Sequence, residues 1–142
     1  MNQLLESLKQ HGAFFAPATP TGQITILNMN LQKIRAAMLP NEFIKFYQIC
    51  GGIKLGNGYI FGPNEYKTGH THPIPDILAI NQELTNIPSM RGKTVFGRND
   101  LFWFAFDTSG ICVMMDNIGL QTLRKYDDIY RAIYECLAGG KI

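Results

Sequence analysis

Hydrophobic residues recur at helical spacing in the first part of the chain. Three leucines within residues 2–11 lie at i, i+1 and i+4, which predicts a short helix that Gly12 ends. Residues 13–25 form a connector that two prolines and a glycine interrupt. Phe14 and Phe15 in this connector are expected to dock on the core.

Two further helices are predicted on either side of Pro40. Leu31, Ile34 and Met38 lie at i, i+3 and i+7, and the helix they predict ends at Leu39, because a residue before proline disfavours helical backbone. Pro40 suits the first turn of the next helix, where its missing N–H costs nothing. The apolar face of that helix consists of Phe43, Phe46, Tyr47 and Cys50.

The hydrophobic period changes from 3.6 to 2 after Gly51-Gly52. Apolar residues alternate over 53–55 and 59–61, on both sides of Gly56-Asn57-Gly58. Asn-Gly between alternating residues is the strongest short hairpin signal, because both turn positions need a positive φ. The sequence therefore predicts a β-hairpin, followed by a polar loop and a short helix over 77–84.

A second group of strands lies in the last third of the chain. Residues 94–96 and 111–115 read as short strands, and 101–106 as a central strand covered on both faces, because it shows no alternation. Residues 107–110 have turn composition. A final helix is predicted from about Asp127, as N-cap, to Leu137.

This order of elements predicts an α+β fold, because strands cluster instead of alternating one-for-one with helices. We expect a single domain over residues 1–142, with a mostly antiparallel sheet and helices packed around it. The residues expected to be largely buried in its core are Phe43, Phe46, Trp103, Phe104 and Ile133.

Composition agrees with one globular domain. Of 142 residues, 46% are hydrophobic and 17% are charged, which excludes a disordered chain. The 13 basic and 11 acidic residues are scattered, so we expect neither a nucleic-acid partner nor a membrane partner. The three cysteines lie in apolar segments, and there is no signal-peptide pattern at the start. Reduced thiols and a cytoplasmic location are expected.

The candidate chemical motifs all have simpler structural interpretations. The glycines at 56, 58 and 62 lie in the predicted hairpin, outside the strand–loop–helix context of a dinucleotide site. His70 and His72 have no second ligand cluster to complete a metal site. Arg98 with Trp103 could form a nucleic-acid stacking platform, but the run is apolar at every position, which favours burial. We expect no enzyme activity, no cofactor and no metal.

Several short motifs together resemble a known family. Leu39-Pro40 opens an aromatic helix over 42–47 that stops at Gly51-Gly52, and a strand ending at Gly62 follows. Phe96-Gly97 then precedes an aromatic strand that ends at Asp107. Over about residues 31–137 the chain resembles the SMI1/KNR4 superfamily, also called SUKH, in particular its YrhA-like branch.

This resemblance implies an α+β fold and a non-enzymatic role. Bacterial members of the family are mostly immunity proteins that bind and neutralise polymorphic toxins, and fungal members are regulatory scaffolds. We therefore expect a binding protein with a cognate protein toxin as its partner. A regulatory or scaffold domain without a toxin, and a small hydrolase, remain alternatives. The oligomeric state stays open.

The expected partner surface consists of polar loops, since binding residues concentrate on loops held by a rigid scaffold. The loop over 64–76 and the turns at 98–100 and 107–110 are the most polar. Acidic groups can steer a partner, and tyrosine is enriched at interfaces. The residues expected to bind the partner are Glu65, Tyr66, Asp76, Asp100 and Asp107.

Overall fold

The computed structural model describes residues 2–67, 73–118 and 121–139. Within these ranges a seven-stranded sheet has the order β1-β2-β3-β4-β5-β6-β7, so every strand lies next to its neighbour in sequence, and every ladder is antiparallel. The elements are α1 (Gln3–Gln10), β1 (Phe14–Phe15), α2 (Thr21–Lys33), α3 (Asn41–Ile49), β2 (Ile53–Leu55), β3 (Gly58–Ile60), α4 (Ile77–Leu84), the short 3-10 helix η1 (Pro88–Met90), β4 (Thr94–Arg98), β5 (Phe102–Phe106), β6 (Cys112–Asp116), β7 (Thr122–Tyr126) and α5 (Ile129–Ala138). The predicted α+β fold is confirmed.

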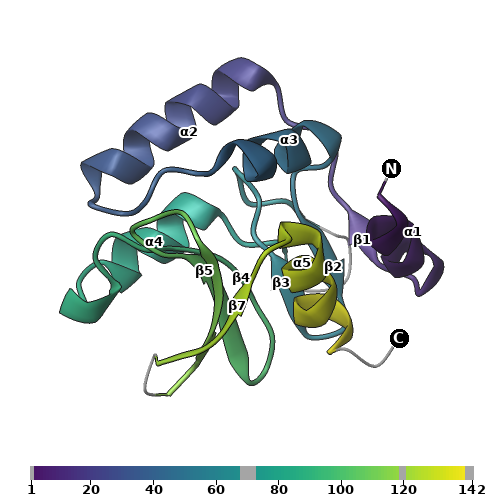
Figure 1. The fold of residues 1–142 in the computed structure, drawn as a ribbon. Coiled ribbons are helices and arrows are strands. Elements are labelled where there is room, and N and C mark those ends of the chain that lie inside the picture. The colour runs from purple at the N-terminus through teal and green to yellow at the C-terminus, as the bar shows by residue number, and fades with distance from the viewer. Residues whose placement is uncertain (1, 68–72, 119–120, 140–142) are drawn as a thin grey trace.

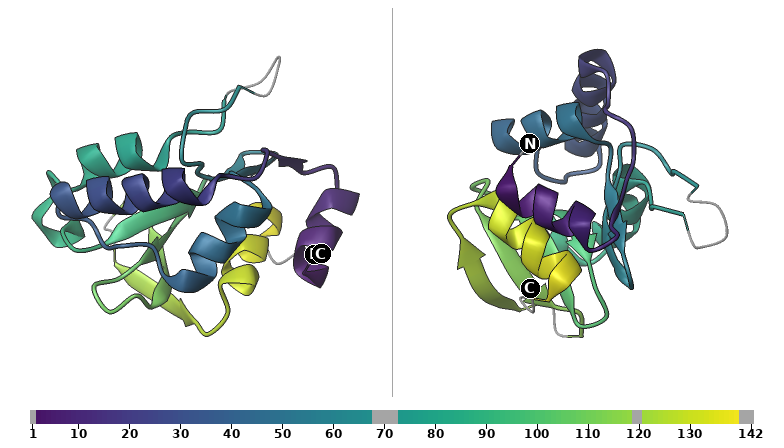
Figure 2. Two further views of the ribbon diagram at one scale, coloured as in Figure 1. Left: turned by 90° about the horizontal axis from the view of Figure 1, so that it is seen from above. Right: turned by 90° about the vertical axis from the view of Figure 1, so that its right-hand side faces the viewer.

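The helices cover the sheet unequally. Helix α5 crosses one face, here called the helix face, and contacts the strands from β2 to β7, with α1 alongside it (Figure 1). Helix α4 packs on β4 from the side away from α5, and α2 lies above both α3 and α4 (Figure 2). The opposite side of the sheet, here called the far face, is covered less completely.

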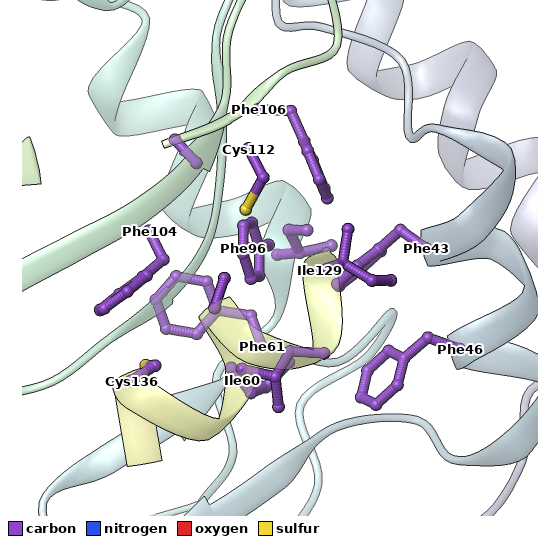
Figure 3. Packing of buried hydrophobic residues seen from close by; sticks show 14 of the residues in the cluster. Phe43, Phe46, Ile60, Phe61, Phe96, Phe104, Phe106, Cys112, Ile129 and Cys136 are labelled. Atoms are coloured by element: carbon purple, nitrogen blue, oxygen red, sulfur yellow. The ribbon is translucent and has the colours of Figure 1, made fainter. Parts of the chain in front are cut away.

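Aromatic side chains make up the centre of the core between α3, α5 and the sheet (Figure 3). The Phe43 ring centroid lies 5.1 Å from that of Phe96 and 5.2 Å from that of Phe106, and Phe96 stacks on Phe106 at 4.7 Å. Phe46 and Phe104 are fully buried as well. These contacts confirm the predicted core except at one residue, Trp103.

Trp103 is only partly buried, and the prediction that β5 is covered on both faces holds only for its second half. Alternation along the strand places Phe104 on the helix face and Trp103 on the far face. The far face lacks a helix at that position. Phe14 and Phe15 were both expected to dock on the core. Phe15 packs on it, whereas Phe14 is exposed.

The predicted helix over 31–39 is wrong. Helix α2 begins after Pro20 and ends at Lys33, and Arg35 has a left-handed φ of 66°. Its buried face includes Asn28, whose Oδ1 accepts a hydrogen bond from the Leu39 backbone N–H at 2.8 Å. This polar residue breaks the apolar pattern, so the true register of the helix is not evident from hydrophobicity.

The predicted hairpin is confirmed, with its turn one residue earlier than expected. Leu55 pairs with Gly58, so the turn residues are Gly56 and Asn57, and only Gly56 has a positive φ, of 57°. Glycine at the first central position is typical of a type II′ turn. The N-cap of α5 is Asp128 instead of Asp127, since its carboxylate accepts from the Tyr130 N–H.

The three cysteines are buried and unpaired, as predicted. Burial raises the pKa of the Cys50 and Cys112 thiols to about 12, and it raises that of Cys136 as well. Thiols in such surroundings behave as small hydrophobic groups and not as nucleophiles. In the described part of the chain, no helix combines the length and the apolar character needed to cross a bilayer.

Candidate functional site

Three turns at one end of the sheet are joined by side-chain amides. The Asn57 amide donates to Asp100 Oδ2 at 3.0 Å, and the Asn117 amide donates to the Asp100 carbonyl at 2.8 Å. These bonds connect the β2–β3 turn and the start of the β6–β7 connection to the β4–β5 turn. Residues 56–57, 99–101 and 117–118 are here called the turn edge.

The β4–β5 turn is held from inside as well. Asn99 Oδ1 accepts hydrogen bonds from the backbone N–H groups of Leu101 and Phe102, at 3.0 and 2.8 Å. Its amide nitrogen donates to the Cys136 carbonyl in the last turns of α5, at 3.1 Å. The turn is therefore fixed to both the sheet and the helix, and Leu101 is left 64% exposed at its tip.

A groove of about 650 Å³ opens on the helix face beside the turn edge. Its lining residues come from the C-terminal half of α5, from strands β5 to β7 and from the β2–β3 hairpin. Its apolar lining consists of Leu55, Leu101, Phe102, Phe104, Met114 and Leu137. An apolar groove with a few polar groups at its margin is the usual form of a binding site.

The polar margin of this groove consists of the turn-edge residues Asn57, Asn99 and Asp100 and of an ion pair between β7 and α5. Arg124 Nη1 lies 2.9 Å from Glu135 Oε1, with the Arg124 side chain 54% exposed and the Glu135 side chain 17% exposed. The Tyr126 hydroxyl donates to Glu135 Oε2, and the Arg124 guanidinium lies 5.0 Å from the Tyr126 ring centroid. Burial, followed by the bond to Glu135, raises the pKa of Tyr126, so the hydroxyl keeps its proton at neutral pH.

A second, polar pocket of about 360 Å³ lies behind the same turn edge. Tyr59, Arg98 and Trp103 line it, and the register of β3, β4 and β5 places all three on the far face. Asp100 and Asn117 of the turn edge line it as well. The turn edge thus separates an apolar groove from a polar pocket.

The residues predicted to bind a partner do not form one surface. Glu65 and Tyr66 are exposed on the loop after β3, where Tyr66 stacks on Phe14 at 5.7 Å. Asp100 lies at the turn edge, at one end of β5, and Asp107 lies beyond the other end. The predicted residues therefore belong to at least two separate places.

Two of the predicted acidic residues have local structural roles. Asp76 is the N-cap of α4 and accepts from the Leu78 N–H at 2.8 Å. Asp107 Oδ1 accepts from the N–H groups of Ser109 and Ile111, at 2.8 and 3.0 Å, which closes the β5–β6 turn. Such bonds are typical of aspartate in caps and turns.

Sequence reasoning missed the groove. Leu101 was included in the buried strand over 101–106, whereas β5 begins at Phe102 and leaves Leu101 in the turn. Arg124 belongs to β7, which was not predicted. His70 and His72 lie outside the described residues; within the described ranges, no three His, Cys, Asp or Glu side chains converge in the way a metal site requires.

Comparison of the chain with protein-family models, with curated proteins and with solved structures finds no match.

Proposed function

We propose that this protein is a non-enzymatic binding protein of the immunity type, which neutralises a polymorphic toxin by direct contact through the turn edge and the groove beside it. The observation that carries the proposal is the exposed Leu101 side chain on a turn fixed by Asn99. The likeness of the sequence to the SMI1/KNR4 superfamily points to the same class of function.

The turn edge has the features of a protein-binding surface. Besides Leu101, two further aliphatic side chains of the same part of the chain are exposed: Ile118 on the β6–β7 connection and Leu123 on β7. Exposed apolar groups rimmed by polar residues are typical of interaction sites. Because Asn99 and Asn117 already hold the turns, binding would cost little further ordering of the backbone.

The ion pair indicates what the partner presents. Arg124 contacts Glu135 through Nη1, and a guanidinium has five N–H donors in a planar fork. An acidic side chain of the partner would extend this pair to a network at the groove margin. The partner surface that fits is thus an apolar side chain for the groove, flanked by a carboxylate for Arg124.

A hydrolase is supported less well by the same structure. The thiols that could act as nucleophiles are buried, and the pKa values of Cys50 and Cys112 are raised to about 12, far from the range that favours a thiolate. The groove is lined by apolar groups, by the Arg124–Glu135 ion pair and by three polar residues of the turn edge, Asn57, Asn99 and Asp100. Because the side chains of these three residues already form hydrogen bonds within the protein, the arrangement suits contact better than proton transfer.

Co-expression tests the proposal. A candidate toxic domain, chosen from the genes that neighbour this one, is expressed with the wild-type chain, with Leu101→Asp, or with Ile26→Asp as a matched control on α2, where Ile26 is 60% exposed. We expect growth rescue and a purified complex with the wild type and with Ile26→Asp, and loss of both with Leu101→Asp at an unchanged melting temperature.

Each other outcome has a distinct meaning. No rescue by the wild-type chain would refute the immunity function. A stable complex without rescue would favour the regulatory or scaffold alternative. Rescue by Leu101→Asp at the wild-type level would show that the groove is not the interface.

A further inference from the structure

A row of alternating aromatic and cationic side chains crosses the far face of the sheet. The strand register pairs Phe14 with Lys54 and Lys54 with Tyr59. It then pairs Tyr59 with Arg98 and Arg98 with Trp103. Directly paired residues share a face, so these five side chains, here called the cross-sheet row, lie next to one another. Four strand spacings of about 4.8 Å make the row about 19 Å long.

The middle of the row is cationic. Lys54 Nζ lies 5.4 Å from the Tyr59 ring centroid, and the Arg98 guanidinium carbon lies 5.7 Å from it. The two cations therefore cover the tyrosine ring in cation–π contacts, which is why Tyr59 itself is buried. Lys125 pairs with Val113 and Val113 with Ala105, so it adds a further cation to the same face.

The two ends of the row are aromatic and open. Trp103 is partly exposed in the polar pocket described above. At the other end Phe14 is exposed and stacks on Tyr66, with ring centroids 5.7 Å apart. The row thus has a stacking surface at each end and two cations between them.

We propose that the cross-sheet row binds single-stranded nucleic acid, a property that goes beyond the proposed function and does not depend on it. A base stacks on Trp103, another stacks on Phe14 and Tyr66, and the intervening phosphates contact Lys54 and Arg98. Aromatic side chains on a sheet face, with basic residues beside them, are a general means of binding unpaired bases. The sequence led us to expect no nucleic-acid partner because its basic residues are scattered. The cations of this face come from three separate strands, β2, β4 and β7, so they form no basic run in the sequence.

The polar pocket predicts which bases bind best. The Asp100 carboxylate only accepts hydrogen bonds, and it would repel a phosphate, so the pocket suits a base. The exocyclic amino groups of cytosine and adenine can donate to this carboxylate, whereas the one donor on the Watson–Crick edge of thymine, N3–H, lies between two carbonyl oxygens that the carboxylate repels. We expect an oligo-dC strand to bind more tightly than an oligo-dT strand of equal length.

An acidic protein surface is the competing occupant. Carboxylates would pair with Lys54 and Arg98, but they would make no use of the aromatic ends, and Asp100 would oppose them. The observations therefore favour a ligand that carries both phosphates and aromatic rings.

The single tryptophan of the chain makes the test direct. Purified protein is titrated with oligo-dC of about ten nucleotides, a length within the ~4–16 nucleotides that single OB folds bind. We expect saturable quenching of Trp103 fluorescence, weaker binding to oligo-dT, and a linear fall of log affinity with log salt. Inorganic polyphosphate at equal phosphate concentration is expected to compete at least tenfold less well than oligo-dC.

Variants locate the site, with a labelled oligonucleotide and fluorescence anisotropy as readout. Phe14→Ala and Trp103→Ala are each expected to weaken binding about fivefold or more, equivalent to the ~1 kcal/mol minimum of one stacked base. Arg98→Gln is expected to lower the salt slope by about 0.7. Arg131→Gln, an exposed arginine on α5, is the matched control and should bind as the wild type does.

Four results would overturn the proposal. They are the absence of oligonucleotide binding, equal competition by polyphosphate, an equal loss with Arg131→Gln and Arg98→Gln, and Trp103 quenching by the cognate toxin alone. The last result would assign the row to a protein interface. Phe14 and Arg98 are exposed, so their variants keep the test valid if Trp103→Ala fails to fold. The growth-rescue assay is independent of all four.

Discussion

The buried Asn81 side chain of α4 connects this helix to β4 by hydrogen bonds, so a substitution there tests how the helix is joined to the sheet. This side chain is 1% exposed, and its Oδ1 accepts from the Val95 N–H at 2.9 Å. Its amide nitrogen donates to the carbonyls of Val95 and Ile77, at 2.9 and 2.8 Å. Strand β3 pairs with β4 only at Gly97 and Arg98, so Asn81 takes the place of a strand partner for Val95.

Asn81→Ala leaves the N–H and the C=O of Val95 without these partners inside the protein. Each buried polar group that loses its partner costs about 1–3 kcal/mol, so for the two groups we expect a loss of about 2–6 kcal/mol. Total stabilities are about 5–15 kcal/mol, so this is a large fraction. At about 3–4 °C per kcal/mol for a chain of this size, the melting temperature should fall by about 6–24 °C.

Urea unfolding followed by circular dichroism measures this loss, with an unchanged m-value as evidence that the same transition is compared. Asn86→Ala, just after α4 and exposed, is the control and should change stability by less than about 0.5 kcal/mol. A loss below about 1 kcal/mol for Asn81→Ala, or one equal to the control, would refute the role assigned to this side chain.

Two further predictions concern backbone packing and thiol burial. A Cβ at Gly62 would lie 2.3 Å from the Gly51 carbonyl oxygen, whereas one at Gly22 meets nothing within 4 Å. Thermal melting should show Gly62→Ala destabilised by about 1–3 kcal/mol or more and Gly22→Ala unchanged or stabilised; equal effects would contradict this. Burial raises the pKa values of Cys50 and Cys112 to about 12 in the fold, from the ordinary thiol value of 9.0. Their stabilising contribution is thus complete below pH 9 and is lost as the pH rises towards 12, and urea midpoints that do not fall between pH 9 and 11 would contradict it.

Elements with strong hydrophobic periodicity could be predicted from the sequence. Helix α3, with Phe43 and Phe46 on one face, and the hairpin around Gly56 follow directly from spacing and turn chemistry. Helix α2 was misplaced because Asn28, a polar residue, occupies its buried face, where it bonds to the Leu39 N–H. Strand β7 was missed because its residues up to Lys125 are exposed, so no apolar alternation marks it.

The candidate sites were harder to predict than the elements, since each depends on contacts between distant segments. Asn57 and Asp100 are 43 positions apart, and Arg124 meets Glu135 only because β7 returns beside α5. The same holds for the cross-sheet row, whose members come from five strands. The Arg98–Trp103 pair was visible in the sequence, but its exposure depends on the lack of a covering helix on the far face.

Hydrogen exchange of the purified complex with the cognate toxin maps the proposed interface segment by segment. We expect slower exchange of amides over 99–102 and 122–124, around Leu101 and Arg124, and unchanged exchange over α2, around Ile26. Protection confined to α2, or to the loop that carries Tyr66, with no change at the turn edge, would contradict the proposal that the turn edge and its groove form the binding surface.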